Sequence, residues 1–168
     1  MATLTVWRFP TVEGAENALD LLRQLQKQQL ISIADAACVS WPEGRKKPRT
    51  RDLGSLTGAG ALGGAFWGLL FGLIFLVPLL GAAVGAAIGA LSGSLAHVGV
   101  DREFVGTVRS RVTPGTSALF VMSDRTVLDR AVEPFKETGA TLLSTDLSDE
   151  EETRLWDAFG EAPRRDRR

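Results

Sequence analysis

Residue types that often carry chemistry are sparse in this chain, which has one cysteine, Cys38, and one histidine, His97. A single cysteine cannot form an internal disulfide or a cysteine-cluster metal site, and a single histidine excludes histidine-rich ligation. We expect Cys38 to be a small buried strand residue, because neither cysteine nor histidine lies beside it. His97 has two interpretations, a proton-sensitive interfacial residue or a side chain that simply reaches water.

Two further patterns resemble binding sites. Gly58-x-Gly60-x-x-Gly63 matches the dinucleotide fingerprint, but it follows a basic stretch and has no acidic residue about 20 positions later. The acidic run Asp149–Glu152 could hold a cation, but it is explained more simply as the start of a helix. Since no convergent pair of ionisable groups is evident, we predict a non-enzymatic protein without catalytic residues, cofactor or metal.

The 168 residues allow one domain, or one domain with an appendage. Charged residues make up 23% and apolar residues 45%, so wholesale disorder is not expected. The formal net charge is −1, whereas nucleic-acid binding usually needs a strong basic excess on one face. Nucleic acid is therefore not an expected partner.

Apolar periodicity predicts alternating strands and helices on both sides of a glycine-rich middle. Before the middle, a strand at 3–9 precedes a helix with Thr11 as its N-cap, and a strand follows at 31–41. After it come a helix at 101–112, a central strand at 118–122, a helix ending near Gly139, a strand at 141–147 and a final helix. Two such halves predict an α+β, ferredoxin-like sandwich with its helices on one sheet face.

The middle of the chain carries no Asp, Glu, Lys or Arg from Leu53 to Val100, a run of 48 residues. It divides at Pro78 into two arms, Leu56–Val77 and Leu79–Val98, each long enough to cross a bilayer as a helix. We therefore predict a transmembrane helical hairpin inserted between the two halves. The resulting divisions are 1–42, the basic linker 43–52, the hairpin 53–100, the second half 101–162 and a disordered basic tail 163–168.

Glycines recur at every fourth position in each arm, forming a glycine zipper: Gly60, Gly64, Gly68 and Gly72, then Gly81, Gly85, Gly89 and Gly93. Such stripes let helices approach closely in membranes. Each glycine costs about 1 kcal/mol relative to alanine in a helix interior, so close contact within the hairpin or between copies is needed to offset the cost. We predict a homo-oligomer.

Three alternatives stay open for this segment. In the first, the hairpin dips into the bilayer without crossing it, because its turn at Pro78 has no polar residue. In the second, it forms the shared core of a soluble oligomeric scaffold. A small pore is disfavoured, because polar residues cluster at the ends of the arms.

Basic residues precede the charge-free segment and predict which side of the membrane it enters. The linker carries Arg45, Lys46, Lys47, Arg49 and Arg51, for which we expect contact with anionic lipid headgroups or a place in a solvated loop. Arg102, Arg109 and Arg111 follow the second arm. By the positive-inside rule, both ends of the hairpin, and therefore the folded domain, should be cytoplasmic.

The chain resembles the bacterial membrane proteins grouped as domain of unknown function 1269. The resemblance rests on the opening strand TLTVWRFP, on the helix with Ala15-Glu16-Asn17-Ala18-Leu19, and on the glycine-rich segment from Gly58 to Gly93 followed by an α+β half. It covers about residues 3–147. It implies a protein of the bacterial inner membrane, with a link to stress and no established reaction, and supplies no catalytic residues.

Overall fold

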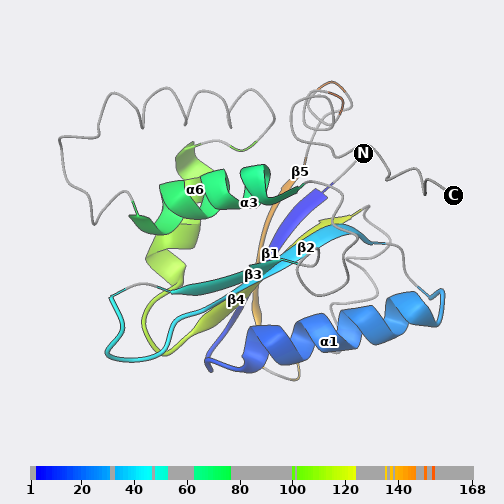
Figure 1. Ribbon diagram of the computed structural model, residues 1–168, viewed down its shortest axis with the longest axis horizontal. Helices are drawn as coiled ribbons and strands as arrows, with labels where there is room; N and C mark the ends of the chain where they lie inside the picture. Colours follow the sequence, from blue (N-terminus) through cyan, green and yellow to red (C-terminus); the bar gives the residue numbers. More distant parts are fainter. Residues whose placement is uncertain are drawn as a thin grey trace, which may run out of the picture.

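A computed structural model describes residues 3–30, 33–46, 48–52, 63–76, 100, 102–123, 135, 137, 139–146, 150 and 153 (Figure 1). These residues form five strands and three α-helices, one of which continues into a π-helical turn, η1. In chain order the elements are β1 (Thr3–Phe9), α1 (Gly14–Lys27), β2 (Ile33–Ser40), β3 (Arg49–Asp52), α3 (Gly63–Phe71), η1 (Gly72–Leu76), α6 (Arg102–Arg111), β4 (Ser117–Ser123) and β5 (Thr141–Asp146).

The strands form one sheet in the order β3-β2-β4-β1-β5, and every neighbouring pair is antiparallel. Because β4 lies between β1 and β2, the two strands joined by α1 are parallel but not adjacent. The α+β class predicted from the sequence is confirmed, and so is the central position of β4. Of the helix predicted before Gly139, Phe135 is described and buried, and Gly139 has a positive φ of 80°. The tail 163–168 lies outside the described residues.

Helices cover both faces of the sheet, so the expectation of helices on one face is wrong. Figure 1 shows α1 below the sheet and α3 and α6 above it. All seven residues of β4 are buried, with Leu119 packed on the α1 face and Phe120 on the α3 face. A strand that is apolar on both faces has to be covered twice, which explains the second helical layer.

The N-terminus of α1 is capped from another strand, so the prediction of Thr11 as N-cap is wrong. The residue before the helix, Glu13, makes no side-chain capping bond. Instead Ser117 Oγ on β4 accepts a hydrogen bond from the Ala15 N–H at 2.9 Å and donates one to the Thr11 carbonyl at 2.7 Å. The cap is long-range in sequence, and local spacing could not reveal it.

Part of the predicted basic linker 43–52 belongs to the sheet. Arg49–Asp52 form the edge strand β3, which pairs with β2 from Ala37↔Asp52 to Ser40↔Arg49. Basic side chains are a common protection for a sheet edge against pairing with other chains.

We predict that Ser117→Ala lowers the free energy of unfolding by about 1–2 kcal/mol, because it removes the acceptor for one helix-terminal N–H and the donor to a loop carbonyl. Urea denaturation measures the change. Ser110→Ala is the matched control, since Ser110 Oγ makes its bond on the exposed side of α6. Equal effects of the two substitutions would contradict the role of Ser117.

Candidate helix-packing surface

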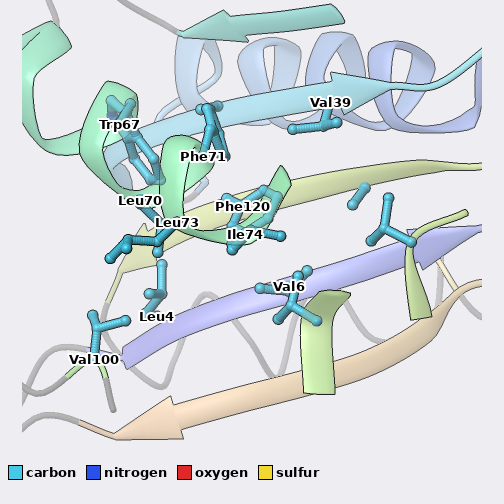
Figure 2. Close-up of a cluster of buried hydrophobic side chains, with 14 of the residues drawn as sticks. Leu4, Val6, Val39, Trp67, Leu70, Phe71, Leu73, Ile74, Val100 and Phe120 are labelled. Atoms are coloured by element: carbon cyan, nitrogen blue, oxygen red, sulfur yellow. The ribbon is translucent and has the colours of Figure 1, made fainter. Parts of the chain in front are cut away.

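The first arm of the charge-free segment packs against the sheet in the described structure. The buried side chains of α3 and η1 face β1, β2 and β4, and together they form a cluster with Val100 and with α6 (Figure 2). Their exposed fractions range from 0% to 7% for Trp67, Leu70, Phe71, Leu73, Ile74 and Phe75. This part of the predicted insertion therefore contributes to the hydrophobic core of the α+β domain.

Aromatic rings fix how α3 lies on the sheet. Trp67 stacks on Phe71 with ring centroids 5.8 Å apart, and Phe71 meets Phe120 of β4 edge-on at 5.0 Å. At the other end of the segment, Phe75 of η1 meets Trp41 edge-on at 5.9 Å. Offset and edge-on pairs of this kind contribute about 0.5–1.5 kcal/mol each beyond the burial of their area.

A buried carboxylate anchors α3 to β2. Asp35 is 1% exposed, and its Oδ2 accepts a hydrogen bond from the Trp67 indole N–H at 2.9 Å. Its Oδ1 accepts a bond from the Ala36 N–H, also at 2.9 Å. The pairing register of β2 shifts between Ile33 and Asp35, which directs Asp35 toward α3.

Arg109 of α6 secures the other end of the segment. Its Nη2 donates to the Leu73 carbonyl at 2.6 Å and its Nε to the Ile74 carbonyl at 2.9 Å. A cation bonded to carbonyls near the C-terminal end of a helix is favoured both by the hydrogen bonds and by the helix dipole. α3 and η1 are thus tied to the domain at Trp67 and again at Leu73 and Ile74.

Gly68 of α3 and Gly72, the first residue of η1, lie away from this core. Together with Gly64 we call them the glycine ridge, and they are three of the eight predicted packing glycines. Gly68 is exposed and Gly72 is half-buried, and a Cβ built at either would meet nothing within 4 Å among the described residues. The remaining predicted packing glycines lie outside the described residues: Gly60, Gly81, Gly85, Gly89 and Gly93.

Of the predicted lipid-contact residues, Arg45 and Lys46 are exposed in the β2–β3 turn, Arg49 is exposed in β3, and Arg51 also lies in β3. Lys47 is outside the described residues. Cys38 is buried on the α1 face, as expected, and His97 is outside the described residues. Across the described ranges, no cluster of three His, Cys, Asp or Glu residues could hold a metal ion. No helix in that part of the chain is both long enough and apolar enough to cross a membrane.

Sequence reasoning missed the polar residues that position the ridge, namely Asp35, Trp67 and Arg109. One signal was present, because Asp35 interrupts an apolar strand and a buried carboxylate needs a donor. Arg109 gave no comparable signal, since an arginine on an amphipathic helix is ordinarily solvated.

We predict that Trp67→Phe destabilises the domain by about 1–3 kcal/mol, because Asp35 loses a donor while most of the ring volume is kept. A double-mutant cycle with Asp35→Leu, which removes the acceptor at similar volume, followed by urea denaturation, isolates the contact from the packing change. A coupling free energy near zero would show that the indole–carboxylate bond does not stabilise α3 on the sheet.

A family model described as a protein of unknown function (DUF1269) matches residues 61–160. The match begins inside the charge-free segment and continues past Ser148, so it includes the acidic run and leaves out the opening strand and α1. Neither a search of curated proteins nor a search of solved structures finds a match to this chain. Since the model covers more than half of the residues, the chain belongs to the DUF1269 family.

Proposed function

We propose that this chain is a non-enzymatic protein of the bacterial inner membrane that self-associates through the glycine ridge. Its α+β domain, which we take to be ferredoxin-like, faces the cytoplasm, and the charge-free segment supplies the attachment to the bilayer. The split β1–α1–β2 arrangement around β4 supports the ferredoxin-like assignment.

The open side of α3 carries the proposal of self-association. The side chains on one side of the helix are buried, while Gly68 and Gly72 leave the backbone bare on the other. A bare ridge allows another helix to approach more closely than side chains would permit. A second copy presents the same ridge, and a symmetric pair of ridges is the simplest closed assembly.

The buried side of α3 limits how the segment can enter a membrane. Trp67, Phe71 and Phe75 lie in the core of the domain and are not available to lipid while α3 is docked. Between η1 and Val100 the chain has the 23 charge-free residues 77–99, and Phe75 and Val100, on either side of them, belong to the same buried cluster. A single crossing would separate these two residues, and two crossings need about 40 residues.

We therefore propose that residues 77–99 dip into one leaflet and return. A segment of 23 residues is too short to cross the bilayer twice but long enough to enter one leaflet and return. This arrangement differs from the dip with its turn at Pro78 that the sequence left open, because α3 is docked on the sheet. Residues 77–99 themselves lie outside the described residues.

A soluble oligomeric scaffold is the second candidate function. It is favoured by the same burial, because Trp67 to Phe75 fill a core of the kind found in water-soluble α+β domains. In this candidate, the glycine ridges of several copies pack together without lipid.

Gly68→Leu should weaken self-association without unfolding the domain. Leucine fits at this position, since its Cβ would meet no described residue within 4 Å, but its side chain would hold a second helix away. Gly106→Leu is the matched control, because Gly106 is an exposed glycine of α6 with equally open surroundings. Crosslinking and light scattering in detergent compare the two.

Both substitutions should raise helix stability by up to about 1 kcal/mol, so a change in assembly that only Gly68→Leu produces is a contact effect. Equal oligomer size for the two variants and the parent chain would contradict association through the ridge.

Membrane attachment predicts that the full chain stays in the membrane fraction after an alkaline carbonate wash. In the dipping arrangement, a cysteine at Leu79, in a Cys38→Ala background, should react with an impermeant maleimide only after the cells are opened. Labelling of Leu79→Cys in intact cells would indicate a spanning hairpin. Release by carbonate as a monodisperse particle would support the soluble scaffold instead.

A further inference from the structure

One end of the α+β domain is organised around Trp41, the residue that directly follows β2. The Trp41 N–H donates to the Thr116 carbonyl at 3.0 Å, and its own carbonyl accepts a bond from the Gly115 N–H. The indole N–H donates to the Arg45 carbonyl at 2.8 Å. Because Trp41 also packs against Phe75, the β2–β3 turn, the α6–β4 turn and the end of η1 lie together.

Positive charge gathers at this end. We define the Trp41 end by its five exposed cations, which are Arg45, Lys46, Arg49, Arg109 and Arg111. Arg109 reaches the carbonyls of Leu73 and Ile74 beside Phe75, and Arg49 pairs with Ser40, the neighbour of Trp41 in the chain. Within the described residues none of the five forms an ion pair, although the acidic residue Glu43 lies at the same end, against Gly115.

The local charge contrasts with the whole chain, whose formal net charge is −1. Opposite the sheet, α1 carries acidic as well as basic residues, including the Asp20–Arg23 pair at 3.6 Å. The cations are therefore concentrated where the charge-free segment continues beyond η1. A cationic rim beside an uncharged apolar segment, with a tryptophan between them, is the arrangement expected at a membrane surface.

We infer that the Trp41 end binds anionic phospholipid headgroups and that Arg109 and Arg111 of α6 act in this together with the basic β2–β3 turn. The inference rests on the proposed membrane attachment and adds the orientation of the domain, with α6 and the β2–β3 turn toward the bilayer. Nucleic acid is the other polyanion to consider. It is less suitable, because a phosphate backbone gains nothing from the adjoining uncharged segment.

Two of the cations can be removed without breaking a described contact. Arg45 and Arg111 each use a backbone carbonyl for their internal bonds, to the Trp41 indole and to Arg8 Nε respectively. Arg45→Gln and Arg111→Gln should therefore leave the fold intact. Lys27→Gln is the control, since Lys27 is an exposed cation at the end of α1, on the opposite face of the sheet.

The test measures flotation of the full chain with vesicles of phosphatidylcholine alone and with vesicles that also contain phosphatidylglycerol. Each arginine substitution should weaken binding to the anionic vesicles about fivefold, which corresponds to about 1 kcal/mol per cation near an anionic surface. Binding to the neutral vesicles should not change, and Lys27→Gln should resemble the parent chain. Added salt should reduce the difference between the vesicles.

Failure of this inference can be distinguished from failure of the proposed function. Equal binding of Arg111→Gln and Lys27→Gln to the anionic vesicles would overturn the inference but leave membrane attachment intact. Absence of binding to either vesicle would overturn both. If duplex DNA bound the parent chain and lost affinity with Arg111→Gln while vesicle binding did not change, the surface would be one for nucleic acid, and the lipid assignment would be wrong.

Discussion

The contact between Asp35 and Trp67 determines where the charge-free helix lies. Apolar packing alone is weakly directional, so an uncharged helix on an apolar sheet could take several positions of similar free energy. A buried carboxylate is tolerated only where donors meet it, and the Ala36 N–H and the Trp67 indole do so at one position. The hydrogen bond between Asp35 and Trp67 therefore selects one position for α3. The bonds from Arg109 to the carbonyls of Leu73 and Ile74 hold η1 in a place consistent with that position.

Local patterns predicted the elements that depend on local periodicity. The strand at Thr3–Phe9 and the helix at Arg102–Arg111 fall where alternation and helical spacing place them. The features that the sequence did not reveal depend on distant partners. Ser117 of β4, and not Thr11, caps α1. The end of the basic linker pairs with β2 and forms an edge strand. Neither partner can be inferred from spacing along the chain.

The sequence predicted which glycines form the candidate site, but it did not predict which side of the helix faces the rest of the domain. The four-residue spacing identifies Gly64, Gly68 and Gly72 as one stripe, but it does not say which side of the helix the rest of the domain occupies. The apolar run from Trp67 to Phe75 suggested lipid as the partner, whereas β1, β2 and β4 cover these side chains in the structure. Composition cannot distinguish a lipid-facing helix from one that is buried by its own sheet.

The docked position of α3 changes the energetic argument about its glycines. Burial of a side chain such as Trp67, Leu70 or Phe71 contributes about 1.5–3 kcal/mol, so the sheet already offsets the cost of glycine in this helix. Association is therefore not required to make α3 stable. Yet alanine would fit at Gly68 and Gly72 and would favour the helix by about 1 kcal/mol at each position. The described domain gives no reason for glycine there, and a second helix that approaches within the space of a side chain would supply one.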